Sequence, residues 1–268
     1  MNLEKDMMTK IALVTGAASG LGYELALLLI KDDYDLVLVD IDESKLKEVK
    51  KLFNKEFKNE VNLLVKDLSK PGAAQDIYDE VKHLGTIDVL VNNAGFGLFG
   101  TFANTDWKRE SDMLHLHVLT TTHLTKLILP EMISRKSGKI LNISSLAAFQ
   151  PGPLMSMYYA SKSYILSFSE AIANELKGTG VTVTALCPGP TKTLFQETVS
   201  SDCSENKISF NMACATDVAL YGYNAMKKGK TVAIPGAFNK LLSTIPRFIS
   251  RNMATRIVRN IQEKNRAE

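Results

Sequence analysis

The chain has 268 residues, of which 45% are hydrophobic and 23% charged, with 32 lysines and arginines against 29 aspartates and glutamates. That apolar content is sufficient for one large core, and the length suits a doubly wound sheet of one domain. No apolar run reaches the roughly 18 residues of a membrane span. The first residues, MNLEKDMM, do not resemble a signal peptide, so a cytoplasmic protein is expected. Cys187, Cys203 and Cys214 lack metal-ligand spacing, and no metal site is predicted.

The first predicted strand, residues 10–15, is followed by a glycine-rich turn and an apolar helix over residues 21–30. Gly16, Gly20 and Gly22 permit a tight turn and a close backbone approach. The N-terminus of the helix could then receive a pyrophosphate on its free amides. The alternative is an ordinary glycine-rich turn.

The second predicted strand, residues 35–40, ends in Asp40. An acid at this distance from the glycines can accept both ribose hydroxyls of NAD and would repel the extra phosphate of NADP. No lysine or arginine occupies the turn or the two positions after Asp40. We therefore expect NAD as the cofactor, with NADP less favoured. The alternative is that Asp40 caps the next helix, as Asp42 could.

Further strands are predicted over residues 61–65, 87–91, 138–145, 181–186 and 231–235, with helical patterns between them and no linker or repeat. This alternation predicts a single α/β domain over residues 1–268. We expect a Rossmann-like, doubly wound parallel sheet of about seven strands, with helices on both faces and a C-terminal helical extension. Asn92, Asn93, Ala94 and Gly95 follow the fourth strand, where asparagine side chains can tie strand ends together.

Tyr158 and Lys162 are four residues apart, so they would share one face of a helix. A phenol must lose about three pKa units to act near neutral pH, which corresponds to about 4 kcal/mol. A lysine roughly 4 Å away supplies about that much at an effective dielectric of 20. We therefore expect Lys162 to lower the pKa of Tyr158, which would act as a general acid/base with Ser145 orienting the substrate oxygen. Alone, such a pair more often marks a solvated helix face.

These motifs occur in a fixed order: Thr-Gly-x-x-x-Gly-x-Gly, Asn-Asn-Ala-Gly, a serine thirteen residues before Tyr-x-x-x-Lys, and Pro188-Gly189 followed by threonines. From about Thr9 to Gly236 the chain thereby resembles the compact branch of the short-chain dehydrogenase/reductase family. The resemblance implies that Tyr158 is the acid/base, that Lys162 also grips the nicotinamide ribose, and that Ser145 orients the substrate. The cofactor site that it implies consists of Gly16, Ser19, Gly20, Leu21, Gly22, Asp40, Asp67, Leu68, Asn93, Ala94, Gly95, Tyr158, Lys162, Pro188, Gly189, Thr191 and Thr193.

One position departs from the family pattern. Thirteen residues before the Leu-Pro that ends the long fourth helix, the family usually has an asparagine that anchors a water chain to the lysine. Counting back from Pro130, this chain has His117. A histidine titrates near 6.5 and could relay protons in a pH-dependent way. We hypothesise that His117 joins the proton path; the alternatives are a buried structural histidine or a shifted register with His115 in its place.

The positive charge of the chain is concentrated in residues 238–268, which carry a net charge of +5, while the remainder carries −2. Apolar residues in this extension recur at spacings close to one helical stripe. A basic amphipathic helix can lie on an anionic membrane or bind an acidic partner. The alternative, which we favour, is that the apolar stripe packs on the body or on a second subunit.

Aromatic and methionine residues near the predicted site favour an apolar or ring-bearing carbonyl substrate. They are Phe96, Phe99, Phe149, Met155, Met157, Phe195, Phe210 and Met212. We therefore expect hydride transfer between NAD and an apolar alcohol or ketone. The alternatives are an NADPH-dependent 3-oxoacyl-type reductase and a non-catalytic dinucleotide-binding regulatory protein. No nucleic-acid partner is expected, and the family resemblance implies a homodimer or homotetramer formed through helices 106–134 and 157–177.

Overall fold

The computed structural model describes residues 10–191 and 214–267. Its centre is a parallel sheet of seven strands in the order β3-β2-β1-β4-β5-β6-β7, which confirms the predicted fold class. The strands are β1 (Lys10–Thr15), β2 (Tyr34–Asp40), β3 (Val61–Val65), β4 (Ile87–Asn92), β5 (Gly138–Ile143), β6 (Val181–Leu186) and β7 (Val232–Ala233).

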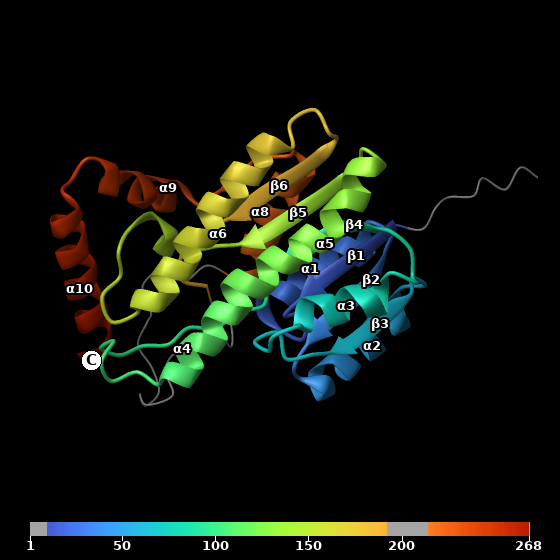
Figure 1. Ribbon diagram of the computed structural model, residues 1–268, viewed down its shortest axis with the longest axis horizontal. Helices are drawn as coiled ribbons and strands as arrows, with labels where there is room; N and C mark the ends of the chain where they lie inside the picture. Colours follow the sequence, from blue (N-terminus) through green and yellow to red (C-terminus); the bar gives the residue numbers. More distant parts are fainter. Residues whose placement is uncertain (1–9, 192–213, 268) are drawn as a thin grey trace, which may run out of the picture.

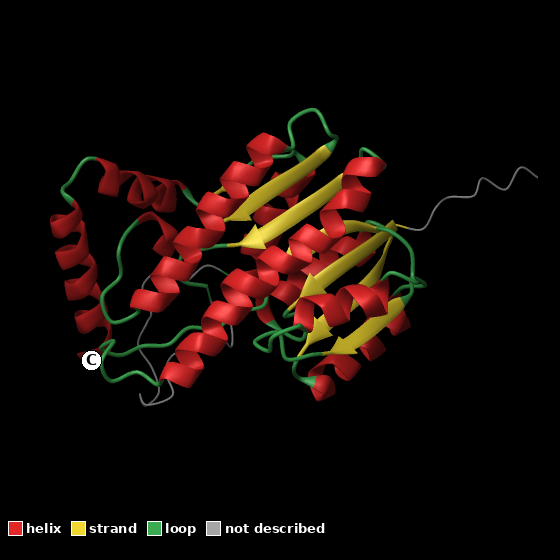
Figure 2. Ribbon diagram, viewed as in Figure 1, coloured by secondary structure: helices red, strands yellow, loops and turns green. Residues whose placement is uncertain are grey.

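Helices cover both faces of the sheet (Figures 1 and 2). Along β1, Ile11 and Leu13 pack into the core on one face, and Ala12 and Val14 into the core on the other. A strand buried on both faces therefore appears in the sequence as a continuous apolar run. One layer comprises α1 (Gly20–Lys31), α2 (Glu43–Glu56) and α8 (Ala215–Lys227), and the opposite layer comprises α3 (Ala73–Val81), α5 (Thr121–Ser134) and α6 (Ser156–Glu175).

The strand order reverses at β1, which lies between β2 and β4. Thr15 at the end of β1 is paired with Val39 of β2, and Val14 with Val91 of β4. The carboxyl ends of the three strands therefore meet at one edge of the sheet. In open α/β sheets, ligands bind in the crevice at such a switch point.

The long helix expected over residues 106–134 is interrupted. It consists of α4 (Trp107–Leu114), a π-helical segment η1 (His115–Thr120) and α5. Within η1, His117 is buried and Leu119 is exposed. His115 is only half-buried, so the register with His117 inside is the one that the structure adopts.

The chain ends in the extension formed by α9 (Ala237–Thr244), η3 (Ile245–Arg247) and α10 (Arg251–Ala267), which lies along one end of the molecule (Figure 1). Ala254 and Val258 of α10 are buried. Many other apolar side chains of the extension are exposed, so the body covers only part of the predicted stripe, and its packing on a second subunit stays a prediction. No helix in the described part of the chain has the length and apolar character needed to cross a bilayer.

Candidate active site

The glycine-rich turn holds β1, α1 and the end of β4 close together. Gly16 has a φ of 66°, and a Cβ there would lie 2.7 Å from Asn93 Nδ2. A Cβ on Gly22 would lie 1.9 Å from the carbonyl oxygen of Gly16. Ser19 precedes α1 without a side-chain cap. The first amides of a helix lack intrahelical acceptors, so this N-terminus suits an anionic ligand.

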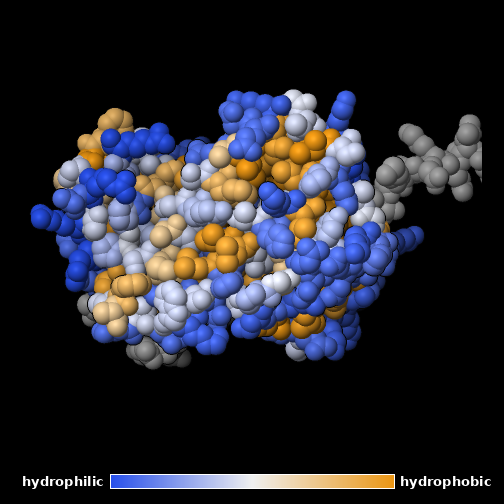
Figure 3. Space-filling model, in the orientation of Figure 1, coloured by the Kyte–Doolittle hydropathy of each residue, from blue (hydrophilic) through white to orange (hydrophobic). Residues whose placement is uncertain are grey.

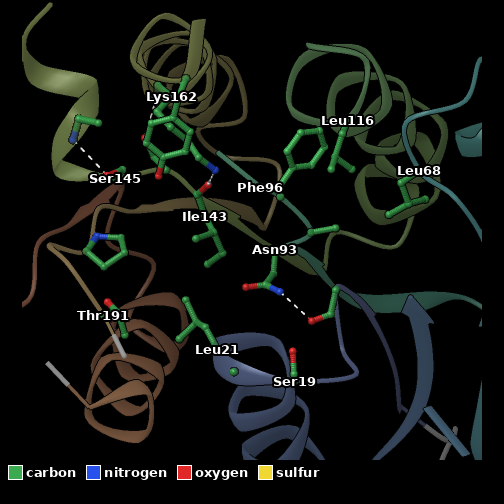
Figure 4. Close-up of a pocket in the computed structure, with 18 of the residues that line it drawn as sticks. Ser19, Leu21, Leu68, Asn93, Phe96, Leu116, Ile143, Ser145, Lys162 and Thr191 are labelled. Atoms are coloured by element: carbon green, nitrogen blue, oxygen red, sulfur yellow. Dashed lines mark hydrogen bonds between the residues drawn. The ribbon is translucent and has the colours of Figure 1, made fainter. Parts of the chain in front are cut away.

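The turn opens into a cleft of about 830 Å³ at the carboxyl edge of the sheet. In Figure 4, Ser19 and Leu21 lie on the opposite side of this cleft from Lys162 and Ser145. Gly22 packs behind the turn, His117 lies outside the lining, and Thr193 falls outside the described residues. The predicted residues that do line the cleft are Gly16, Ser19, Gly20, Leu21, Asp40, Asp67, Leu68, Asn93, Ala94, Gly95, Ser145, Tyr158, Lys162, Pro188, Gly189 and Thr191.

Backbone amides orient the Asp40 carboxylate toward the turn. The Ala18 N–H donates to Asp40 Oδ2 (2.9 Å), and the Asp42 N–H donates to Asp40 Oδ1 (3.1 Å). Asp42, not Asp40, caps α2, since it accepts from the Lys45 N–H. Each carboxylate oxygen has a further lone pair. Asp40 can therefore still accept ribose hydroxyls.

Asp67 lies on the cleft beyond β3 and is held as a carboxylate. Ser69 donates to it from both the backbone N–H (3.0 Å) and the hydroxyl (2.6 Å), and Lys70 lies 3.2 Å away. Burial alone would raise the pKa of Asp67, but these hydrogen bonds outweigh it and lower the pKa below its usual value. The carboxylate that the resemblance places at the adenine is thus ionised and paired with Lys70.

Asparagines join the strand ends, as predicted. Asn93 Nδ2 donates to the carbonyl oxygens of Thr15 (2.9 Å) and Gly16 (3.0 Å), and Asn92 Nδ2 donates to Asn142 Oδ1 (2.8 Å). These bonds fix the end of β4 against β1 and β5. Asn93, Ala94 and Gly95 consequently line the cleft beside the glycine-rich turn.

Ser145, Tyr158 and Lys162 converge on one side of the cleft. Ser145 follows β5 and caps a short 3₁₀ helix, η2 (Leu146–Phe149), by accepting from the Ala147 N–H (3.1 Å). The Ser145 hydroxyl is also close enough to the Tyr158 phenol to lower its pKa. Lys162 is buried one turn along α6 and donates from Nζ to the Ile143 carbonyl (2.9 Å; Figure 4).

The expectation that Lys162 lowers the pKa of Tyr158 is wrong for this structure. Burial raises the pKa of Tyr158 to about 12, and the nearby Ser145 hydroxyl offsets only part of that rise. Burial also lowers the pKa of Lys162 to about 8, which weakens its charge above neutral pH. Lys162 Nζ lies 5.8 Å from the Tyr158 ring centroid. Near pH 7 the phenol is therefore protonated.

His117 lies behind Tyr158, with its Nδ1 2.9 Å from Ser161 Oγ. The Ser161 hydroxyl donates to the Tyr158 carbonyl (2.8 Å), so we assign the proton of the neutral His117 ring to Nδ1. Nε2 is then an acceptor, and no described residue pairs with it. Burial, and secondarily the Lys162 charge, place the pKa of His117 well below 6.5. The titration expected of a pH-dependent relay therefore does not occur near neutral pH.

Several residues that line the cleft have no signal in the sequence motifs. They are Lys45, Arg109, Asp112, Tyr159 and Gln262. Gln262 comes from α10 and donates to the Tyr159 hydroxyl (2.9 Å). Its only advance signal is its spacing of four and eight residues from the buried Val258 and Ala254. Of the expected apolar lining residues that the structure describes, Phe96 and Met155 line the cleft, whereas Phe99, Phe149 and Met157 do not.

The donor groups of the cleft fit a dinucleotide. The N-terminus of α1 offers amides to a pyrophosphate, and Asp40 offers acceptors to a ribose. The glycine positions leave no room for side chains between the turn and Asn93. Lys162 and Tyr158 lie farther along the cleft, where a nicotinamide ring and its ribose would follow.

Comparisons with known proteins agree with this geometry. A family model described as short chain dehydrogenase matches residues 10–204. The ketoacyl reductase HetN of Nostoc sp. is 37% identical over 188 residues, which span 67% of this chain and 63% of that protein. A short chain dehydrogenase/reductase of Burkholderia phymatum in complex with NAD superposes with a TM-score of 0.80 at 23% identity, covering 90% of this chain and 93% of that one.

A short-chain dehydrogenase of Sphingobium yanoikuyae in complex with NADPH superposes with a TM-score of 0.78 at 24% identity, over 89% of this chain and 94% of that one. At such identities the two solved structures establish the fold, and they carry different nicotinamide cofactors. The family match extends over most of the described chain and includes every residue that lines the cleft except Gln262. The chain therefore belongs to the short-chain dehydrogenase/reductase family of NAD(P)-dependent oxidoreductases.

Proposed function

We propose that this oxidoreductase transfers a hydride between NAD and an apolar alcohol or ketone, with Tyr158 as general acid/base. The observation that carries the proposal is the convergence of Ser145, Tyr158 and the buried Lys162 on one side of the cleft. The nicotinamide supplies or accepts the hydride. Ser145 holds the substrate oxygen, and Tyr158 exchanges a proton with it.

The raised pKa of Tyr158 favours carbonyl reduction near neutral pH. A phenol with a pKa of about 12 is protonated there and can donate its proton to the carbonyl oxygen as the hydride reaches the carbon. The reverse reaction needs the phenolate, which burial disfavours. A full positive charge on Lys162 would stabilise the phenolate. Because the pKa of Lys162 is about 8, that charge declines as the pH rises.

The NAD preference rests on Asp40. Its carboxylate lies on the cleft and is fixed by the amides of Ala18 and Asp42, so a 2′-phosphate would meet an oriented negative charge. Removing the charge should relax this preference. Losing a hydrogen bond to a charged group costs about 1.5–3 kcal/mol, or about tenfold or more in the dissociation constant. We expect Asp40→Asn to weaken NADH binding by that factor and to strengthen NADPH binding.

An apolar substrate is supported by the lining near Tyr158, where Phe96, Leu116 and Met155 contribute side chains. Such surfaces stabilise a hydrocarbon or ring more than a sugar. The lining contains no described cluster of residues able to hold a metal ion.

The test combines binding and turnover. NADH and NADPH are titrated by fluorescence, and apolar ketones and their alcohols are then assayed with wild type and Tyr158→Phe. We expect Tyr158→Phe to lower kcat by at least about 100-fold, in line with the usual contribution of acid/base catalysis, without loss of NADH affinity. Tyr164→Phe is the matched control, because Tyr164 lies on the same helix and hydrogen-bonds Thr122 away from the cleft. Cofactor binding without turnover of any ketone would support the regulatory alternative.

An NADPH-linked 3-oxoacyl reductase is the second candidate, and the similarity to the ketoacyl reductase HetN favours it. Lys45 and Arg109 also line the cleft and could meet a phosphate. Turnover of an acetoacetyl thioester with NADPH, at a rate above that of apolar ketones with NADH, would favour this candidate.

A further inference from the structure

Helix α9 turns its apolar side away from the body. Phe238 and Leu241 lie three residues apart on α9, which places them on one side, and Ile245 and Phe248 follow in and just after η3. Their exposed fractions are 62%, 57%, 39% and 82%. The opposite side is small and polar: Ser243 is buried there, and Asn239 donates to the Pro235 carbonyl. An amphipathic helix on the surface of a globular protein usually packs its apolar side on the core instead.

Helix α10 also exposes apolar side chains. Met253, Ile257 and Ile261 follow one another at four-residue intervals and are exposed, although Ala254 and Val258 beside them are buried. Both helices therefore present apolar side chains that the body leaves uncovered, at the same end of the molecule (Figure 1). We call these side chains together the docking surface and define it by Phe238, Leu241, Ile245, Phe248, Met253, Ile257 and Ile261.

Only positive charges accompany the docking surface between residues 237 and 262, where the sequence has no Asp or Glu. The cations there are exposed. Arg259 pairs with Glu263 just beyond the segment (2.7 Å), and the other four have no ion pair among the described residues. Figure 3 shows strongly hydrophilic and apolar residues intermixed at the end of the molecule that carries α9 and α10. The cations are Lys240, Arg247, Arg251, Arg256 and Arg259.

The charge identifies the occupant. In a two-fold dimer each patch meets a copy of itself, so these cations would face cations across the interface. An anionic bilayer offers the opposite charge together with an apolar interior, and its fluidity requires no matching shape. We propose that α9, η3 and α10 dock the protein on the surface of an anionic lipid bilayer, with the docking surface entering the interface between headgroups and acyl chains.

Docking would place the substrate cleft beside the lipid. Gln262 of α10 lines that cleft and holds the Tyr159 hydroxyl. If the substrate is an apolar ketone, as the proposed function states, a ketone dissolved in the bilayer would be concentrated next to the site. Only this step, and not the docking itself, rests on the proposed function.

The test is flotation of the full chain with vesicles of phosphatidylcholine, either alone or mixed with phosphatidylglycerol. We expect binding to the anionic vesicles that weakens as salt is added. The variant Lys240→Gln/Arg247→Gln/Arg251→Gln should lose about fivefold in partition coefficient per charge removed. Its control, Lys51→Gln/Lys55→Gln/Lys58→Gln, removes the same charge from exposed positions in and just after α2 and should bind as wild type does.

An apolar variant tests the second contribution. Phe238→Asp/Phe248→Asp should abolish binding, whereas Leu52→Asp, at an exposed position of α2, should not. Melting curves establish whether each variant folds. If Phe238→Asp/Phe248→Asp does not fold, flotation of the charge variants still tests the proposal. Equal flotation of wild type and both extension variants, or no flotation of wild type, would overturn the proposal. So would sedimentation showing that Phe238→Asp/Phe248→Asp splits a dimer into monomers. Flotation needs no substrate, so its outcome is independent of the proposed reaction.

Discussion

His117 is enclosed between η1 and α6, where burial and the nearby Lys162 both disfavour its protonated form. Its ring is tilted against Phe96 and stands edge-on to Tyr158. From Nδ1 the hydrogen-bond chain runs through the Ser161 hydroxyl to the Tyr158 carbonyl, which cannot pass a proton on. This geometry favours the alternative of a buried structural histidine over the proton relay.

Neutral burial of His117 has a consequence for stability against pH. Below about 6.5 an unfolded histidine takes up a proton, whereas the folded ring remains neutral until its lowered pKa is reached. The unfolded state is therefore favoured as the pH falls, by up to about 1.4 kcal/mol per unit. Between pH 6.5 and 5, we expect the unfolding free energy of wild type to fall by up to about 1.4 kcal/mol per pH unit more than that of His117→Asn. Urea unfolding measures the difference; parallel pH curves for the two proteins would contradict it.

Gly95 and His117 should be energetically coupled. A Cβ on Gly95 would lie 2.6 Å from His117 Nε2, closer than atoms in contact can approach. Gly95→Ala should therefore cost about 1–3 kcal/mol of unfolding free energy, as overpacking in a core usually does. The shorter asparagine of His117→Asn should recover part of this cost in the double variant. A double-mutant cycle measures the coupling, and strictly additive effects would show that the two groups do not compete for space.

At the residue scale, the motif spacing correctly predicted which side chains meet, but it did not predict their protonation states. The order of the motifs predicted that Ser145, Tyr158 and Lys162 meet at a cleft, and they do. A spacing of four residues indicates a shared helix face and contains no information about burial. The phenol and the ammonium are both buried, and the cost of removing charge from water shifts each pKa away from the charged form.

At the scale of elements, the strands were predictable from their short apolar runs, which the core buries on both faces in β1 and β6. The ranges 10–15, 61–65 and 181–186 agree with β1, β3 and β6 residue for residue. The last strand, expected over residues 231–235, is limited to Val232–Ala233, which pairs only with β6 at the edge of the sheet. The π segment η1 had no signal, because its apolar spacing resembles that of an ordinary helix.

The orientation of α9 was equally hidden from the sequence. Its apolar spacing predicted a helix with one hydrophobic side, and that side was expected to pack on the body or on a second subunit. Asn239 and Ser243 instead face the body. Helical periodicity identifies a stripe, but only the positions of neighbouring elements decide which way the stripe points.

Helix α10 contributes to the substrate end of the cleft through Gln262. The Gln262–Tyr159 hydrogen bond connects α10 to the start of α6, one residue from Tyr158. Gln262→Ala should raise the KM for an apolar ketone about two- to tenfold, as expected for a hydrogen bond worth about 0.5–1.5 kcal/mol. The dissociation constant of NADH should not change. Asn260→Ala is the control, because Asn260 lies on the same helix and is exposed. A shift of NADH affinity in Gln262→Ala would assign the residue to the cofactor instead.

For the whole molecule, two separate surfaces remain to be accounted for. One is the docking surface on α9 and α10, and the other is the face formed by η1, α5 and α6, which is nearly free of the excess positive charge. On that second face Leu119 and Tyr164 are exposed. The Tyr164 hydroxyl lies 2.9 Å from Thr122 Oγ1, and the ring stacks on Phe168. The family resemblance assigns subunit association to these helices.

We expect the protein to associate as a homodimer or homotetramer through η1, α5 and α6. Burying apolar side chains such as Leu119 contributes about 25 cal/mol per Å², whereas a buried, unpaired carboxylate costs several kcal/mol. Leu119→Glu/Tyr164→Glu should therefore sediment as a monomer where wild type sediments as an oligomer. Phe238→Asp/Phe248→Asp is the opposite control: it should retain the oligomer and lose flotation with anionic vesicles. If Phe238→Asp/Phe248→Asp dissociated the oligomer and Leu119→Glu/Tyr164→Glu did not, the docking surface would be the subunit interface instead.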